Sequence, residues 1–342
     1  MIVRHATMIA AGVLAAAALV TAQPARAQDK KLKFAHTFPA THYLFADGGK
    51  VFQDSVTKAT NGRITFDSYH AGQLGKEGAG MLASSIADVA ILVPSYEAAK
   101  LPLTSVSELP GMYGSSCEAT AMLWSIVKDG GPLNEAEYKP KGIKVLYVAV
   151  LPPYQVMTTS KKIVTVKDLS GLKIRANGAA MDKTVQAVGA IPVRVPSPEL
   201  YDALTRGTVD GAYWPIGSTK TTGLEKVLHY LAKGPQLGGG STLVGMSMKQ
   251  WNVLSPQDQA VFMQAGALAQ KSLCTYLDKA DEEVEASLVN DHKLVVTALP
   301  KEDIARMHER FAPIAADWAK DMDASGRPGS ALLKAFRDAP SR

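Results

Sequence analysis

One long helical segment constrains this chain more than any other feature of its sequence. Ser255 is suited to cap a helix that begins at Pro256, because serine accepts from free backbone N–H groups and proline is favoured in the first helical turn. Asp258 adds a negative charge beside the positive end of the helix. No further proline occurs before about Asn290, which predicts roughly 50 Å of helix, straight or broken near its middle. Such a helix exceeds the size of one small domain.

Strand-like and helical runs alternate along the rest of the chain, which predicts the α/β class. The expected strands are 32–36, 63–69, 88–93, 172–175 and 241–248, and the expected helices before the long one are 43–60 and 75–86. Segments 143–150 and 155–159 are expected to be extended segments that cross between two lobes.

The first 27 residues have the pattern of an export signal. Arg4 gives a positive start, residues 9–22 are apolar and free of charge, and Ala25-Arg26-Ala27 is a small-x-small cleavage site. The apolar run is too short for a membrane anchor, and the arginines are not paired, so we expect a Sec-type signal and a periplasmic protein. About 315 residues remain after residue 27, enough for two domains of ordinary size.

Composition and cysteine usage exclude several classes of protein. The chain is 46% hydrophobic with a net charge of +5, which becomes +3 without residues 1–27, too small an excess to favour nucleic acid binding. The cysteines are Cys117 and Cys274, and their spacing fits no metal motif or CxxC pair. An oxidising compartment permits a disulfide between them, and two buried free thiols are equally compatible with the sequence.

Arg175 lies at the end of a predicted strand. The segment 172–175 alternates apolar and polar residues, and Asn177-Gly178 ends the strand and opens a helix. Open α/β sheets bind ligands at the carboxyl ends of their strands, and a guanidinium group binds a carboxylate through two parallel hydrogen bonds. Arg175 is therefore a candidate carboxylate anchor, although a solvated surface charge is the simpler interpretation of any single arginine.

Several short motifs occur in a defined order along the chain. They are LKFAH at 32–36, TNGR at 60–63, AGQLG at 71–75, SIADVA at 85–90, ELP at 108–110, DLSGLKIR at 168–175, GAIP at 189–192, ELYDAL at 199–204, VDG at 209–211 and WNVLSP at 251–256. Together they resemble the extracytoplasmic solute receptors of TRAP transporters, the DctP-type family.

The resemblance implies a two-lobed periplasmic binding protein fold with hinge crossings and a long helix that runs under both lobes. We expect 29–152 plus 241–280 in the first lobe and 153–240 plus 281–342 in the second. It also implies capture of an organic carboxylate between the lobes and delivery to the permease subunits of a membrane transporter. Some relatives dimerise through the long helix, but no extra apolar face supports this here, so we expect a monomer.

The family motif makes Arg175 the residue that binds the substrate carboxylate. Gln155 stands where many dicarboxylate and sialic-acid receptors have a second arginine, and Tyr213 and Trp214 stand near the position of a common asparagine. An aromatic pair in place of a second anion clamp favours a monocarboxylate with an aromatic or bulky body, or a 2-oxo or 2-hydroxy acid. Packing in the core is the alternative role for Tyr213 and Trp214. A C4-dicarboxylate remains possible.

Further candidate contacts lie at predicted strand ends. They are His36, Thr37 and Tyr43 after the first strand, Ser95 and Tyr96 after the third, Tyr154 beside Gln155, and Asn177 at a helix start. For His36 a structural role is equally compatible. Some 2-oxo-acid receptors of the family bridge their ligand with a metal, using a glutamine and a carboxylate; Trp214 replaces that carboxylate here, so we expect no metal and no cofactor.

Two other functional classes compete with the transport receptor. An exported enzyme acting on organic acids would need catalytic residues, and the sequence has no Gly-x-Ser-x-Gly elbow, HExxH motif or phosphate-binding loop. We therefore expect no enzymatic activity. A receptor that signals through a sensor has the same sequence features as a transport receptor.

Overall fold

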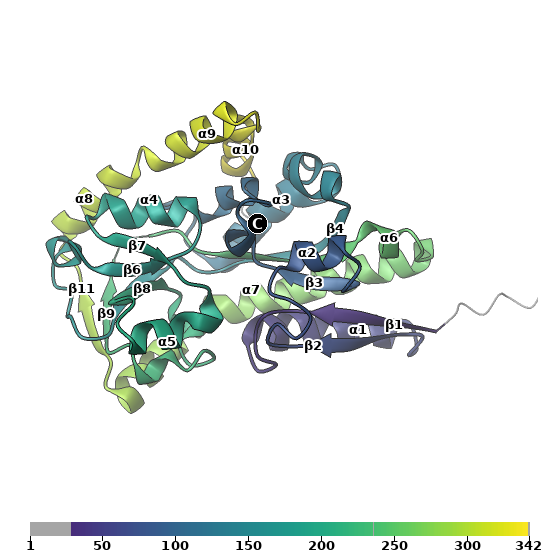
Figure 1. Ribbon diagram of the computed structural model, residues 1–342, viewed down its shortest axis with the longest axis horizontal. Coiled ribbons are helices and arrows are strands. Elements are labelled where there is room, and N and C mark those ends of the chain that lie inside the picture. Colours follow the sequence, from purple (N-terminus) through teal and green to yellow (C-terminus); the bar gives the residue numbers. More distant parts are fainter. Residues whose placement is uncertain (1–28, 235, 341–342) are drawn as a thin grey trace, which may run out of the picture.

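The computed structural model describes residues 29–234 and 236–340, and it builds them around two β-sheets (Figure 1). The α/β class is confirmed. The predicted export signal at 1–27 lies outside the described residues. Within those residues, no helix is both long and apolar enough to cross a membrane.

The first lobe is built on a five-stranded sheet in the order β2-β1-β3-β10-β4. Its strands are β1 (Lys30–Ala35), β2 (Ile64–Tyr69), β3 (Val89–Leu92), β4 (Ile143–Val150) and β10 (Ser241–Ser247). The parallel strands β2, β1 and β3 continue into β10 and β4, which run antiparallel to their neighbours. Every residue of β3, β4 and β10 is buried, as expected for strands covered on both faces.

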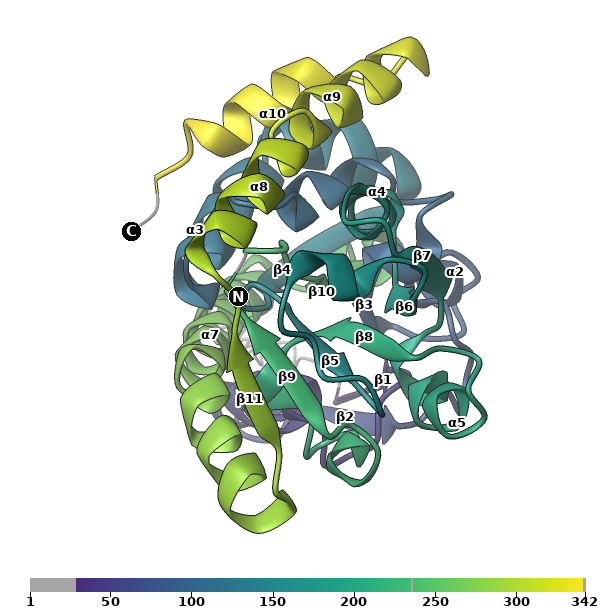
Figure 2. The same cartoon turned by 90° about the vertical axis from the view of Figure 1, so that its left-hand side faces the viewer.

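The second lobe is built on a six-stranded sheet in the order β11-β9-β5-β8-β6-β7, which Figure 2 shows from its own side of the molecule. Its strands are β5 (Gln155–Thr158), β6 (Lys173–Ala176), β7 (Ile191–Arg194), β8 (Gly211–Trp214), β9 (Tyr230–Lys233) and β11 (Val295–Ala298). Strand β6 is parallel to both of its neighbours, β7 and β8, so the end of β6 opens onto the carboxyl edge of this group.

Helices cover both sheets. They are α1 (Lys50–Ala59), α2 (Gly78–Ala83), α3 (Ser116–Val127), α4 (Ala179–Ala187), α5 (Leu200–Thr205), α6 (Met248–Trp251), α7 (Pro256–His292), α8 (Lys301–Phe311), α9 (Ile314–Ala324) and α10 (Gly329–Arg337). The predicted helix at 43–60 is split: its first part, Leu44–Gly49, is a π-helical turn that runs directly into α1.

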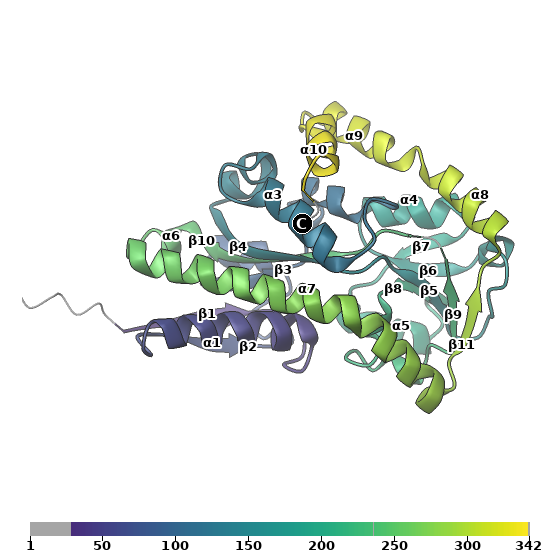
Figure 3. The ribbon, with the colours of Figure 1, turned by 180° about the vertical axis from the view of Figure 1, so that it is seen from behind.

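Helix α7 is the predicted long helix, and it is continuous over 37 residues, about 55 Å. Ser255 caps its start by accepting from the backbone N–H of Asp258 at 3.1 Å, as expected. Figure 3 shows α7 passing along both lobes. It approaches β4 so closely at Gly266 that a Cβ there would lie 2.3 Å from the carbonyl oxygen of Leu146. A side chain at this position would push the helix away from the sheet.

Two short extended segments also connect the lobes. Residues 151–154 join β4 to β5, and the segment that follows β9 returns to β10. They lie side by side, because the backbone N–H of Leu151 donates to Gly240 at 2.8 Å and that of Tyr154 donates to Gly238 at 2.7 Å. Hinge crossings are present as expected, but they lie elsewhere than predicted: segments 143–150 and 155–159 pair within the two sheets as β4 and β5, and the chain crosses between them.

The C-terminal helices α8, α9 and α10 form an arm over the top of the molecule (Figure 1). Helix α8 contacts α4, α9 contacts α4 and the 3-10 segment Leu103–Glu108, and α10 packs on α3. The arm therefore contacts elements from both expected lobes. The residues at which one lobe ends and the other begins remain a prediction.

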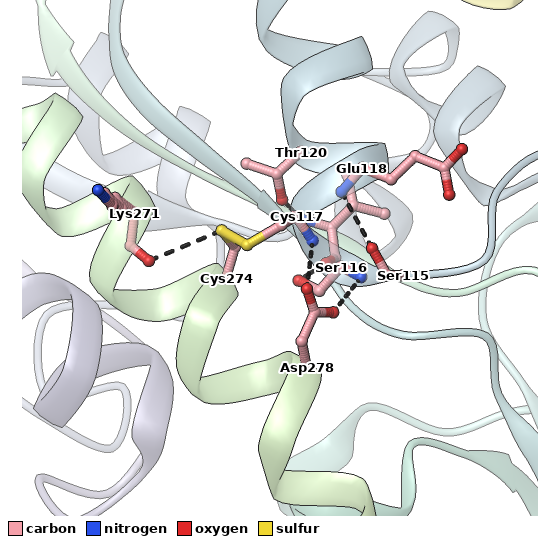
Figure 4. The surroundings of a disulfide bond; sticks show 9 residues. Ser115, Ser116, Cys117, Glu118, Thr120, Lys271, Cys274 and Asp278 are labelled. Carbon is pink, nitrogen blue, oxygen red and sulfur yellow. Dashed lines mark hydrogen bonds between the residues drawn. A yellow bond between two sulfur atoms is a disulfide. The ribbon is translucent and has the colours of Figure 1, made fainter. Parts of the chain in front are cut away.

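Cys117 and Cys274 form a disulfide that joins the start of α3 to the middle of α7 (Figure 4). One turn beyond Cys274, the carboxylate of Asp278 accepts from the backbone N–H groups of Ser116 at 2.5 Å and Cys117 at 3.1 Å. A negative charge at a helix start is stabilising, so the covalent bond and the ionic cap hold the same helix end against α7. Of the two alternatives for the cysteines, the structure selects the bond.

We predict that reduction of this disulfide, or the double change Cys117→Ser and Cys274→Ser, lowers the free energy of unfolding by about 2–4 kcal/mol. The bond spans 157 residues, so its loss frees a large part of the unfolded chain. Thermal unfolding with and without a reducing agent measures the effect. The double variant serves as the control, since its Tm should not respond to the reductant; an unchanged Tm of the reduced wild type would contradict the prediction.

Candidate ligand-binding site

A small cavity of about 40 Å³, partly open to solvent, lies between the two lobes. Its walls come from the ends of β3, β6 and β8 and from both hinge crossings. The lining residues are Phe38, His42, Tyr43, Leu44, Val93, Ser95, Tyr96, Leu151, Tyr154, Arg175, Asn177, Met181, Ser197, Trp214, Pro215, Ser218, Gly240, Ser241 and Thr242.

Arg175 is held in place from three sides. Its Nε donates to the carbonyl oxygen of Val195 at 3.0 Å, and its Nη1 donates to that of Tyr213 at 3.4 Å. The guanidinium carbon lies 5.0 Å from the centre of the Trp214 ring, within the range of a cation–π interaction. Asn177 donates to the same Val195 oxygen at 2.8 Å.

The charge of Arg175 is buried without an ion-pair partner. The side chain is 3% exposed, and no carboxylate of the described chain lies within 4.0 Å of its nitrogens. A buried, unpaired charge is costly, because it loses its hydration without gaining an opposite charge. The site is therefore complementary to an anion. A bound carboxylate would pair with Arg175 and so remove this cost.

The walls around Arg175 are largely aromatic. Trp214, Tyr96 and Tyr154 lie on the cavity, together with Phe38 and His42, whose rings are stacked at 4.4 Å. Burial lowers the pKa of His42 to about 3, helped by the neighbouring His36, so the ring is neutral. A neutral aromatic surface around one cation suits a ligand with a carboxylate at one end and a flat apolar body.

Hydrogen bonds between the lobes close the cavity. The hydroxyl of Tyr96, in the 3-10 segment Pro94–Glu97, accepts from the backbone N–H of Ser197 at 2.8 Å. The hydroxyls of Tyr43 and Ser218 bond each other at 2.7 Å. The lobes therefore lie together, and the residues that line the cavity also hold them together.

The structure brings seven of the eleven predicted contact residues to the cavity wall. They are Arg175, Asn177, Tyr154, Trp214, Ser95, Tyr96 and Tyr43.

Tyr213 and His36 are placed away from the cavity. Successive side chains of a strand point to opposite faces, so Trp214 on the cavity side sends Tyr213 into the core, where it is fully buried. His36 is buried against Phe45 and bonds His70 at 2.8 Å. Burial and the nearby His70 lower the pKa of His36 to about 4. Both side chains thus have the structural role that the sequence left open.

Gln155 and Thr37 also miss the cavity wall. The Gln155 side chain bonds the backbone instead: its amide nitrogen donates to the carbonyl oxygen of Pro153 at 3.4 Å, and its oxygen accepts from the backbone N–H of Gly234 at 3.2 Å. Thr37 lines a separate surface hollow outside Tyr96, together with Lys76 and Glu199, which form an exposed ion pair at 3.0 Å.

The cavity wall also includes residues that were not among the predicted contacts: Phe38, His42, Ser218, Ser241 and Thr242. Phe38 and His42 belong to the loop after β1, in which Thr37 and Tyr43 were named, so this loop was the available signal. Ser218 and Thr242 had no such signal, because their position depends on how distant segments pack.

Residues 34–321 match the family described as bacterial extracellular solute-binding protein, family 7, or DctP. The chain belongs to the DctP family. A solute-binding protein of Albidiferax ferrireducens is 28% identical over 61% of this chain, a match that spans 62% of that relative's length.

Solved structures of TRAP solute-binding proteins have the same fold. One from Rhodoferax ferrireducens, in complex with copurified benzoate, superposes with a TM-score of 0.82 at 26% identity, over 90% of this chain and 96% of that one. One from Bordetella bronchiseptica, with bound (R)- and (S)-mandelate, has a TM-score of 0.80 at 25% identity, over 91% and 98% of the two chains. The resemblance seen in the sequence motifs is confirmed, and so is the two-lobed fold.

We predict that Arg175→Met stabilises the ligand-free DctP-family chain by about 0.5–2 kcal/mol, because it removes an uncompensated buried charge. Asn177 still donates to the Val195 oxygen in this variant, so that carbonyl is not left alone. Thermal unfolding without ligand measures the change.

Arg63→Met is the matched control, since Arg63 is paired with the buried Asp258 at 2.6 Å. The control should lower Tm while Arg175→Met raises it. A fall of similar size in both variants would show that Arg175 is not an unpaired charge.

Proposed function

We propose that this TRAP solute receptor binds an aromatic monocarboxylate, or a 2-oxo or 2-hydroxy acid with a bulky apolar body. Arg175 takes the carboxylate, and Trp214, Tyr96 and Tyr154 enclose the body, with Ser95 and Asn177 as polar contacts. The observation that carries the proposal is the buried, unpaired guanidinium at the end of an aromatic cavity.

The solved relatives support this ligand class. Benzoate and mandelate, the ligands of the two structures named above, each combine one carboxylate with one aromatic ring. Both chemical features have a counterpart in this cavity: the cation of Arg175 and the ring of Trp214, which lie 5.0 Å apart.

Ligand binding is coupled to lobe closure in this proposal. A ligand favours the closed form only if it contacts both lobes, and the cavity offers Arg175 and Trp214 from the second lobe and Tyr96 and His42 from the first. We infer that the closed receptor works as a monomer in the periplasm and delivers its ligand to membrane permease subunits of a TRAP transporter. No reaction is assigned to the site.

We predict that benzoate raises the Tm of the wild-type protein and that Arg175→Met abolishes the shift. Benzoate at about a hundred times its Kd should add about 2.7 kcal/mol to the free energy of unfolding. Succinate is screened beside it as a C4-dicarboxylate. A shift with succinate alone would refute the aromatic ligand class and leave Arg175 as the anchor, whereas an equal benzoate shift in Arg175→Met would refute the anchor.

We predict that Trp214→Leu weakens benzoate binding by roughly tenfold or more, because the ligand loses aromatic contact and Arg175 loses its cation–π partner. Tyr213→Phe is the control, since Tyr213 is the next residue but lies in the core, where its hydroxyl has no partner among the described residues. Calorimetric titration of both variants gives the two affinities. Equal losses of benzoate affinity in the two variants would show that Trp214 and Tyr213 are assigned to the wrong faces of β8.

A further inference from the structure

Glu108 is a second buried charge-bearing group near the cavity, and the ligand site does not use it. It ends the 3-10 segment Leu103–Glu108 and is 1% exposed. Its carboxyl group lies close to the backbone N–H of Ser241, but neither oxygen accepts a hydrogen bond of good geometry from the described residues, and the nearby hydroxyl of Ser241 is also unpartnered. Buried carboxylates normally accept several hydrogen bonds, so the charged form of Glu108 is poorly supported here.

Glu108 lies where the two lobes meet. A Cβ on Gly178 would be 2.8 Å from the Glu108 Oε2 and 3.3 Å from the Cβ of Ser95. Gly178 follows β6 in the second lobe, and Ser95 follows β3 in the first. Gly178 also has φ +92°, a conformation that favours glycine, so its backbone can approach the carboxyl group. Separation of the lobes here would expose the carboxyl group to water.

The charged groups around Glu108 come from several elements. Arg175 of β6 favours its ionised form, whereas Asp182 of α4 and Glu137, which lies before β4, oppose it. Burial is the largest effect and raises the pKa of Glu108 to about 8; the Ser241 backbone and Arg175 offset it only in part. An ionised Glu108 would also compensate the charge of Arg175 and weaken its attraction for a ligand carboxylate.

We propose that closure of the lobes around a carboxylate ligand moves one proton from water to Glu108, which leaves Arg175 as the net charge that the ligand meets. This inference rests on the proposed function, because it requires a carboxylate ligand on Arg175. Glu108 does not touch the ligand in this proposal. It acts through its protonation state, which decides whether the site as a whole is cationic.

Calorimetric titration with benzoate at about pH 7, in two buffers with different heats of ionisation, counts the protons taken up on binding. We expect close to one proton per benzoate in the wild type. Affinity should fall by up to about tenfold per pH unit between roughly pH 5 and 8, and then level off. Affinity falls as pH rises because the pKa of Glu108 is raised in the closed form. In this pH range the closed form keeps a proton on Glu108 that the open form releases.

Glu108→Gln keeps the shape of the neutral acid, so it should bind benzoate without proton uptake and with an affinity that does not depend on pH. Glu137→Gln is the matched control: Glu137 is also a buried acid with a raised pKa, but it accepts from the backbone N–H groups of Leu103 at 2.6 Å and Thr104 at 3.0 Å. Proton uptake should be unchanged in this control. If Glu108→Gln does not fold, the wild-type proton count decides alone.

The outcomes separate the two proposals. Benzoate binding without proton uptake, or uptake that persists in Glu108→Gln, overturns the role of Glu108 and leaves the ligand class intact. If succinate binds and benzoate does not, the aromatic ligand class is wrong, and the same proton count with succinate tests Glu108. If neither acid binds, both proposals fail, since each requires a carboxylate on Arg175.

Discussion

The buried positive charge of Arg175 is the constraint around which the site is organised. Its guanidinium group is fixed by the carbonyl oxygens of Val195 and Tyr213 and by the ring of Trp214, none of which neutralises it. Such a charge makes the closed, ligand-free cavity unfavourable and the closed, anion-filled cavity favourable. In the proposed function, recognition of the ligand and closure of the lobes therefore have the same physical origin.

The scaffold separates what must stay rigid from what must move. Helix α7 lies against β4 at Gly266 and is joined to α3 by the disulfide and by the cap from Asp278. The same helix reaches the second lobe, where Asp281 accepts from the backbone N–H of Gly217 at 2.7 Å, beside the Ser218 that bonds Tyr43. A rigid helix thus contacts both lobes, whereas each of the two crossings is a single extended segment, as expected for a hinge.

Much of the site followed from local sequence patterns. The short alternating strand stopped by Asn177-Gly178 made Arg175 a candidate, and the resemblance to the DctP-type family implied its role as carboxylate anchor. Of the aromatic pair, Trp214 lines the cavity and Tyr213 lies in the core, and strand alternation already implies that the two side chains face opposite sides. His36 could not be decided in advance, because its neutral, buried state depends on His70 and Phe45, which come from other elements.

The sequence by itself determined the α/β class, the long helix from Pro256 and the bounds of the extended segment that forms β4, and it marked Arg175 as the candidate anchor. These depend on neighbours within a few residues: caps, proline positions and the periodicity of apolar side chains. Only the tertiary structure decided the pairing of Cys117 with Cys274, the closed aromatic cavity and the burial of Glu108. Those features arise where segments far apart in the chain come into contact. Burial, charge compensation and disulfide formation all depend on such contacts, which local sequence does not specify.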